Sequence, residues 1–373
     1  LIDETLARIA PLDEDAMAAA RARQDTLTKP QGSLGRLEDL SVVLAGIFGR
    51  PIPRIRRKAL ILAAGDHGVV AEGVSAYPQE VTPQMVLNFL RGGAAINVLA
   101  RHAGANIVIL DAGVAADLEP HPVLRPVKIG RGTANMAVGP APTRRQAIQC
   151  IETGIETAQE QIAEGADLVA CGDMGIGNTT PSSAITAVVT GADPALTTGR
   201  GTGLDDAALT HKVDVIKRAI EVNRPDSRDG LDILAKVGGF EIGVLAGVML
   251  GTAAGRRPVL VDGFISGASA LIAWCMSPAA RHYFIASHQS VEPGHRVGLE
   301  AMGLIPLLDV GMRLGEGTGA ALAMHLVEAA AKCLAEMATF GEAGVSEQLE
   351  DGSIEDGSID ASIKEEDGER VQS

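Results

Sequence analysis

Short apolar runs rich in β-branched and aliphatic residues recur along this chain, and each is followed by glycines and then by a helical pattern. Runs that are apolar at every position suit parallel strands, because a sheet covered by helices is buried on both faces. We therefore expect an α/β fold with a doubly wound, mainly parallel sheet flanked by helices. The expected strands are 59–65, 105–113, 166–172, 257–263, 282–287 and 303–311.

Helical patterns at both ends of the chain predict a second structural unit. Residues 13–24 and 36–48 precede the first expected strand, and residues 318–340 follow the last one. We expect residues 1–50 and about 318–345 to form a small helical domain beside an α/β catalytic domain at 51–317. At the usual ~100–200 residues per domain, the 373 residues of the chain are enough for this division.

Residues 347–373 differ in composition from the rest of the chain. They carry −8 of the formal charge of −15, and the sequence EDGSI occurs there twice in tandem. Self-repelling charge with little apolar surface predicts a disordered tail. The simplest interpretation is a solvated appendage that turnover does not need.

Charge and aromatic content argue against a nucleic-acid partner. The chain is acidic and only 2% of its residues are aromatic, whereas nucleic acids favour a basic surface and aromatic stacking. No apolar run approaches the ~18–20 residues of a membrane span, and the four cysteines show no paired spacing. We therefore expect no membrane partner, a reducing compartment and a cytoplasmic location.

Polar, glycine-rich loops follow the expected strands, where ligands of an open parallel sheet bind. The loop GDMGIGNTTP at 172–181 leads into a helix N-terminus, whose amides and dipole suit a phosphate or a ribose. A tight turn closed by a helix cap is the alternative, since Thr180-Pro181, like Thr82-Pro83, is typical of an N-cap followed by proline. The loop lacks the motifs of a P-loop ATPase or a dinucleotide site.

An acidic residue, Asp262, ends the expected strand 257–263, and a Gly/Ser loop follows it. This arrangement is similar to the loop with which many phosphoribosyltransferases hold a ribose and its 5′-phosphate. Those loops usually contain two adjacent acids, which help to manage magnesium pyrophosphate. The single acid here favours a donor that does not lose pyrophosphate.

Histidines in these loops raise the question of a metal site. His67, His288 and His295 could ligate a metal, but no pair has the i,i+4 spacing of a zinc-protease helix. A histidine in a polar loop more often hydrogen-bonds to substrate or backbone. We therefore expect no metal and no cofactor.

A carboxylate between two glycines, Glu316, lies in the last loop before the C-terminal helix. The thin backbone on either side lets a bound ring approach, and an apolar pocket would raise its pKa, as suits a general base. The alternative is a helix-start glutamate that the helix dipole favours. Lys212 lies in a helical pattern, and from that pattern alone it belongs to a solvated face.

Seven ordered segments resemble the nicotinate-nucleotide:dimethylbenzimidazole phosphoribosyltransferase family over about residues 5–346. Their order along the chain argues against chance similarity. The segments are TKPQGSLGRLEDL at 28–40, GDHGVVAEGVSAYPQEVTPQMVLNF at 65–89, GDMGIGNTTPSSAI at 172–185, GGFEIGVLAG at 238–247, DGFISGASAL at 262–271, SHQSVEPGH at 287–295 and LDVGMRLGEGTGAALA at 308–323.

The resemblance implies an enzyme that assembles the lower nucleotide loop of cobalamin. Its partners would be nicotinate mononucleotide and 5,6-dimethylbenzimidazole, its products α-ribazole 5′-phosphate and nicotinate, and its assembly a homodimer. The glutamate of the family's LGEGTG motif maps onto Glu316, which would take a proton from the benzimidazole while the other ring nitrogen attacks C1′ with inversion.

The resemblance also implies a set of substrate-binding residues, and it makes Lys212 one of them. The benzimidazole would contact Tyr77, Gln84 and Met85. The phosphate and ribose contacts would come from Gly175, Gly177, Asn178, Thr179, Thr180, Lys212, Asp262, Gly263, Ser287, His288 and Ser290, with Asp173, Leu314 and Gly315 as further positions.

One position departs from the family pattern, because many members have Glu where this chain has Asp173. The carboxylate is kept, but its reach is one methylene shorter, which puts an accessory proton-relay role in doubt. Two other functions remain open at this point. They are a non-catalytic protein that binds a benzimidazole or a nucleotide, and a metal-dependent hydrolase that uses the histidines.

Overall fold

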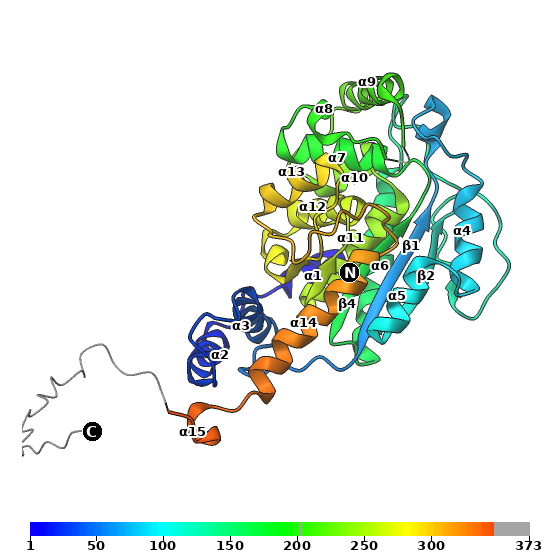
Figure 1. Ribbon diagram of the computed structural model, residues 1–373. Helices are drawn as coiled ribbons and strands as arrows, with labels where there is room; N and C mark the ends of the chain where they lie inside the picture. The colour runs from blue at the N-terminus through cyan, green and yellow to red at the C-terminus, as the bar shows by residue number, and fades with distance from the viewer. Residues whose placement is uncertain (202, 347–373) are drawn as a thin grey trace, which may run out of the picture.

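The computed structural model describes residues 1–201 and 203–346 (Figure 1). The tail predicted to be disordered, 347–373, lies outside the described residues. Within these ranges, no helix combines the length and the apolar character that a membrane span requires.

The core of the molecule is a six-stranded sheet in which every neighbouring pair is parallel. The strand order β3-β2-β1-β4-β5-β6 is the doubly wound order, which reverses its direction of growth between β1 and β4. The predicted α/β class is therefore confirmed. The strands are β1 (Lys58–Gly65), β2 (Ala105–Gly113), β3 (Leu124–Arg125), β4 (Leu168–Met174), β5 (Val259–Val261) and β6 (Phe284–Ala286).

Five of the six predicted strands form, with both ends within two residues of the expected positions. The sixth, 303–311, is wrong, because this segment makes only a single bridge between Leu308 and His288. Pro306 interrupts the run and removes a ladder donor. The sixth strand is instead β3, which has two residues between Pro122 and Pro126 and therefore gives no periodic signal.

Helices cover both faces of the sheet, as its apolar strands require (Figure 1). In β1, Ile61 and Ala63 face one core cluster, whereas Leu60 and Leu62 face the other. The first cluster includes α6 (Arg144–Ala163), α7 (Thr179–Thr190), α9 (Asp206–Asn223), α10 (Gly230–Val237), α11 (Phe240–Ala254), α12 (Phe264–Met276), η2 (Pro278–Tyr283) and α13 (Pro293–Met302), with α1 (Ile2–Ala7) against it. The second includes α3 (Arg36–Phe48), α4 (Val81–Leu90), α5 (Ala95–Ala103) and α14 (Thr318–Glu336). The remaining helices are α2 (Glu14–Thr26), η1 (Gly68–Glu72), α8 (Pro194–Thr197) and α15 (Phe340–Ala343).

Helices from the two ends of the chain pack together, as Figure 1 shows for α2, α3 and the far half of α14. Ala20, Val42, Ala45 and Leu334 share a small apolar cluster there. The Arg23 Nε donates a hydrogen bond to the Leu334 carbonyl oxygen at 2.7 Å. The N-terminal half of α14 packs on the sheet itself, so this helix belongs to both packing regions. The division of the chain into a helical and an α/β domain therefore stays a prediction.

Two of the expected helix caps lie two residues too late. Helix α4 has Glu80 at its N-cap and α7 has Asn178, which places the Thr-Pro pairs inside the first turn. Proline is tolerated there because amides of the first turn have no intrahelical acceptor. The Thr82 hydroxyl instead accepts a hydrogen bond from the Ile176 amide at 3.0 Å, which ties α4 to the loop after β4.

Glycines allow α6 and α11 to pack backbone against backbone. A Cβ on Gly154 would overlap the Val244 carbonyl oxygen. We expect Gly154→Ala to lower the free energy of unfolding by about 1–3 kcal/mol because of overpacking, although helix propensity alone favours alanine by ~1 kcal/mol. Urea denaturation measures the change. Gly341→Ala in α15 is the matched control, since no atom of residues 1–201 or 203–346 lies within 4 Å of its Cβ position. A Gly154→Ala protein at least as stable as the wild type would contradict this packing.

Candidate active site

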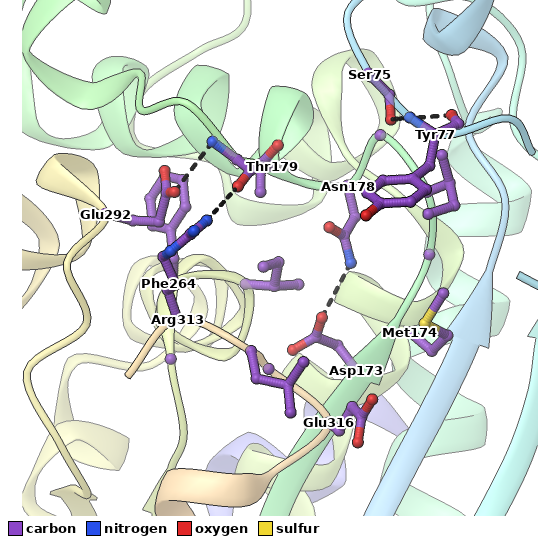
Figure 2. Close-up of a pocket in the computed structure, with 18 of the residues that line it drawn as sticks. Ser75, Tyr77, Asp173, Met174, Asn178, Thr179, Phe264, Glu292, Arg313 and Glu316 are labelled. Atoms are coloured by element: carbon purple, nitrogen blue, oxygen red, sulfur yellow. Dashed lines mark hydrogen bonds between the residues drawn. The ribbon is translucent and has the colours of Figure 1, made fainter. Parts of the chain in front are cut away.

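A cavity of about 650 Å³ opens at the carboxyl ends of the strands (Figure 2). Its walls include the loops after β1 and β4, between which the direction of strand order reverses. In doubly wound sheets this crevice is the usual ligand site, and the volume lies in the range of ~300–1,000 Å³ typical of small-molecule pockets. The fold itself therefore points to this cavity.

Thirteen of the residues predicted from the sequence line this one cavity. They are Tyr77, Met85, Asp173, Gly175, Gly177, Asn178, Thr179, Gly263, His288, Ser290, Leu314, Gly315 and Glu316. Five do not line it. Gln84 is exposed on α4, whereas Thr180, Lys212, Asp262 and Ser287 are buried behind the wall.

The loop that carries Glu316 has an uncommon backbone. Gly315, Glu316 and Gly317 have φ values of 81°, 62° and 87°, and a left-handed conformation costs a residue with a Cβ about 1–2 kcal/mol. Strand β4 lies close beneath this loop, because a Cβ on Gly172 would overlap the Glu316 carbonyl oxygen. The glycines thus allow Glu316 to be held in one place against the end of β4.

Asp262 holds the other side of the same loop. Its two carboxylate oxygens accept hydrogen bonds from the Gly317 amide at 3.2 Å and the Ala320 amide at 2.8 Å. It is fully buried at the N-terminus of α14 and does not line the cavity. The structure therefore places Asp262 as a support for Glu316, and its oxygens already have partners before any ribose is considered.

Glu316 is a buried carboxylate with few hydrogen bonds to offset the cost of its burial. It is 5% exposed, and within the described part of the chain its Oε2 accepts only a long hydrogen bond of 3.4 Å from the Ile96 amide. Burial raises the pKa of Glu316, and the Asp262 charge raises it further, while the Ile96 amide opposes the rise. A carboxylate with a raised pKa at a cavity wall is suited to take a proton from a bound ligand.

A second carboxyl group, Asp173, lies at the end of β4 beside the Glu316 loop (Figure 2). The Asn178 side-chain amide donates a hydrogen bond to its Oδ2 at 3.0 Å. Burial raises the pKa of Asp173 well above its ordinary value, and the charges of Asp262, Glu241 and Glu316 add to the rise. Asp173 is thus the carboxyl group that this environment favours in its neutral form.

An ion pair lies beneath the glycine-rich turn of the site. The His67 Nε2 and the Glu241 Oε1 are 2.6 Å apart, and both side chains are buried. Burial lowers the pKa of His67, but the Glu241 carboxylate and, to a smaller extent, the Asp66 charge raise it, and the pKa is raised overall. A Cβ on Gly175 would meet the Gly65 carbonyl oxygen and crowd this pair, so the turn rests directly on it.

The glycine-rich turn leads into the N-terminus of α7, and Lys212 approaches it from α9. The Lys212 Nζ donates a hydrogen bond to the Thr179 Oγ1 at 2.7 Å. Lys212 is 1% exposed, so the interpretation of a solvated helix face is wrong. Burial lowers its pKa to about 8, while the Glu292 charge opposes the decrease. Together, the helix N-terminus and the lysine suit an anion.

The opposite end of the cavity is largely apolar. Figure 2 shows Tyr77 and Met174 there, on the side of the cavity away from Thr179 and Arg313. Val74, Val81 and Met85 also line the wall. This end suits a flat, uncharged aromatic ring, and the Tyr77 ring, which is 54% exposed, lies at its edge.

Ten residues that line the cavity were not among the site residues expected from the sequence. They are Val74, Ser75, Val81, Met174, Ile176, Gly201, Phe264, Ile265, Glu292 and Arg313. Most of them stand inside the recognised motifs, so proximity in sequence was an available signal. Gly201 had no such signal, because it lies outside these motifs and the fold alone brings it to the site. There the Arg313 guanidinium donates a hydrogen bond to its carbonyl oxygen at 3.1 Å.

The histidines considered for a metal have other partners. His67 pairs with Glu241, His288 contacts the Ser287 hydroxyl at 3.0 Å, and the His295 Nδ1 accepts a hydrogen bond from the Ser290 amide at 3.1 Å. In residues 1–201 and 203–346, no group of three His, Cys, Asp or Glu side chains is arranged to hold a metal ion.

Comparison with known proteins shows the family to which this chain belongs. A family model described as "Phosphoribosyltransferase" matches residues 9–345. The nicotinate-nucleotide–dimethylbenzimidazole phosphoribosyltransferase of Roseiflexus sp. (strain RS-1) is 62% identical over 350 residues, which are 94% of this chain and 99% of that protein. The enzyme of the same name from Desulforudis audaxviator (strain MP104C) is 58% identical over 351 residues, again 94% and 99% of the two chains.

A solved structure extends the agreement to three dimensions. The crystal structure of the enzyme of this name from Thermus thermophilus is 50% identical and superposes with a TM-score of 0.86, covering 90% of this chain and all of that one. The resemblance noted in the sequence motifs is therefore confirmed over nearly the whole length. The chain belongs to the phosphoribosyltransferase family that includes the nicotinate-nucleotide–dimethylbenzimidazole phosphoribosyltransferases.

Proposed function

We propose that the protein transfers the phosphoribosyl group of nicotinate mononucleotide to 5,6-dimethylbenzimidazole. The products are α-ribazole 5′-phosphate and nicotinate, for the lower nucleotide loop of cobalamin. Beside family membership, one observation carries this proposal. The buried Glu316 carboxylate, whose pKa is raised, lines the same cavity as an apolar wall and a glycine-rich turn at a helix N-terminus.

The two ends of the cavity suggest where each substrate binds. The nucleotide phosphate is placed at the N-terminus of α7, near Thr179 and the Lys212 ammonium group. The benzimidazole ring is placed between Tyr77 and Met85, where a largely apolar wall favours an uncharged aromatic ring. The C1′ atom of the ribose then lies between the two ends, within reach of Glu316.

The reaction that follows needs one base and one oriented nucleophile. Glu316 takes the proton from one benzimidazole nitrogen, and the other nitrogen attacks C1′ from the face opposite nicotinate. As the new C–N bond forms, the bond to the pyridinium nitrogen breaks and its electron pair neutralises that ring. Because attack occurs on the opposite face, the β-nucleotide gives an α-product. Holding both rings in one cavity contributes much of the acceleration.

A product assay separates this function from its two alternatives. Purified protein with both substrates is expected to release nicotinate only when dimethylbenzimidazole is present. A binding protein would release none. A metal-dependent hydrolase would release nicotinate without the base and would stop after exhaustive chelation.

We further propose that the enzyme works as a homodimer, on the strength of the family resemblance. Sedimentation equilibrium tests this, with an expected mass of twice the 38.5 kDa protomer. The cytoplasmic location stays a prediction. It is supported by Cys150, Cys171, Cys275 and Cys333, all of which are free thiols.

A further inference from the structure

A buried carboxylate, Glu292, lies in the wall of the cavity and has no part in the proposed reaction. It is the N-cap residue of α13 and is 8% exposed. Its Oε1 accepts a hydrogen bond from the Gly201 amide at 3.1 Å. Its Oε2 is buried and accepts no hydrogen bond from the residues that the structure describes. A buried carboxylate oxygen without a donor is costly, so a partner is expected from elsewhere.

The position of Glu292 in the cavity narrows the choice of that partner. Figure 2 shows Glu292 with Thr179 and Arg313, at the end where the nucleotide phosphate is placed. Distances around Gly201, whose amide donates to Glu292, support this position. A Cβ on Gly201 would lie 3.0 Å from the Thr179 Oγ1 and 3.2 Å from the Lys212 Nζ, so Glu292 lies close to the proposed phosphate site. A carboxylate beside a phosphate is destabilised by charge repulsion, and a hydrogen-bond donor bound to the carboxylate offsets this cost. Between the phosphate and C1′, the nucleotide offers only the 2′- and 3′-hydroxyl groups of its ribose as donors.

We propose that Glu292 is a specificity-determining residue whose carboxylate accepts a hydrogen bond from a ribose hydroxyl of the bound nucleotide. The inference rests on the proposed function, since it takes nicotinate mononucleotide as the ligand. Acidic side chains recognise ribose hydroxyls in the same way in dinucleotide-binding folds. Glu292 therefore selects a ribonucleotide over its deoxy analogue.

Gly199 keeps the carboxylate in this position. A Cβ on Gly199 would overlap the Glu292 Oε2 and would also crowd its carboxyl carbon, at 2.8 Å. Alanine at 199 thus displaces the carboxylate while the Glu292 side chain is still present. This gives a second, independent way to remove the contact.

Glu292 also has an effect on Lys212 that the experiment must separate. Its charge opposes the burial that lowers the pKa of Lys212 to about 8. Loss of the Glu292 charge therefore leaves less of the lysine protonated and weakens phosphate binding. That effect is the same for every nucleotide with a 5′-phosphate, whereas loss of a hydroxyl contact is selective.

The test compares three nucleotides on four proteins. The nucleotides are nicotinate mononucleotide and its 2′-deoxy and 3′-deoxy analogues. The proteins are the wild type, Glu292→Gln, Gly199→Ala and the control Glu300→Gln, an exposed residue on the same helix. The measurement is kcat/KM for each nucleotide at saturating dimethylbenzimidazole.

For the wild type, we expect one deoxy analogue to be used about 10–100-fold less well than the ribonucleotide, as suits a hydrogen bond to a charged group. Glu292→Gln and Gly199→Ala should lower kcat/KM for the ribonucleotide by a similar factor, but by less than about 3-fold for that analogue. Glu300→Gln should leave all three values unchanged. If Glu292→Gln fails to fold, Gly199→Ala and the wild-type comparison still decide the question.

Equal losses for all three nucleotides would overturn the inference and assign the effect to Lys212. So would a wild type that uses both deoxy analogues as well as the ribonucleotide. A wild type that does not convert nicotinate mononucleotide at all would instead refute the proposed function. The two failures are thus distinguishable.

Discussion

Replacing Glu316 with glutamine is expected to lower kcat by about 10²–10⁴-fold, the usual contribution of a general base. The glutamine keeps the size of the side chain and an oxygen for the Ile96 amide, but it cannot take a proton. KM for the nucleotide should change little, because the proposed phosphate site lies at the other end of the cavity. Steady-state kinetics with dimethylbenzimidazole as acceptor measures both quantities.

Glu336→Gln, an exposed residue at the C-terminal end of α14, the helix that begins two residues after Glu316, is the control and should keep wild-type kcat. A Glu316→Gln enzyme within about 3-fold of the wild type would remove Glu316 from the reaction. The pH profile gives an independent check. Because burial raises the pKa of Glu316, kcat should fall with decreasing pH at a higher pH than an exposed glutamate would give.

Replacing Lys212 with methionine is expected to raise KM for nicotinate mononucleotide by about 10–100-fold with a smaller change in kcat. The reason is that a hydrogen bond to a charged group contributes about 1.5–3 kcal/mol. The wild type should itself show a pH dependence, because the pKa of Lys212 is lowered to about 8. Above that pH the amine is neutral and KM should rise, whereas KM of the methionine variant should not follow this transition.

The exposed Lys217 on the same helix provides the control, since Lys217→Met removes one charge from α9 without reaching the cavity. An unchanged nucleotide KM in Lys212→Met would place the phosphate elsewhere. Thermal unfolding of both variants shows whether the buried methionine of Lys212→Met has altered the fold. A misfolded variant would lose activity altogether, with no selective rise in the nucleotide KM.

The parts of the fold with a strong local signal could be predicted from the sequence. Continuous apolar runs identified β1 and β2, because a strand buried on both faces must be apolar at each position. Helix α3 begins and ends where its pattern predicts. Strand β3 could not be found, because two residues between prolines are a strand only through pairing with β2.

The site was predictable where its chemistry is local. Glu316 stood out because two glycines flank it, and the structure shows that Gly315, Glu316 and Gly317 are all left-handed. Burial of Lys212 could not be predicted from its helical pattern, because an amphipathic pattern does not show that α7 covers the lysine. Asp262 was expected to face a ribose, but the N-terminus of α14 occupies both of its oxygens. Contacts between segments distant in sequence decide such cases.

The central claim is a direct transfer in which Glu316 acts as a base. The anomeric configuration of the product tests it most directly, because a base and a nucleophile at this position give opposite results. NMR of the product made by the purified enzyme from β-nicotinate mononucleotide and dimethylbenzimidazole reads this configuration. We predict the α-anomer alone. The β-anomer would contradict the account, since retention requires two displacements and would make Glu316 a nucleophile that forms a covalent ribosyl intermediate.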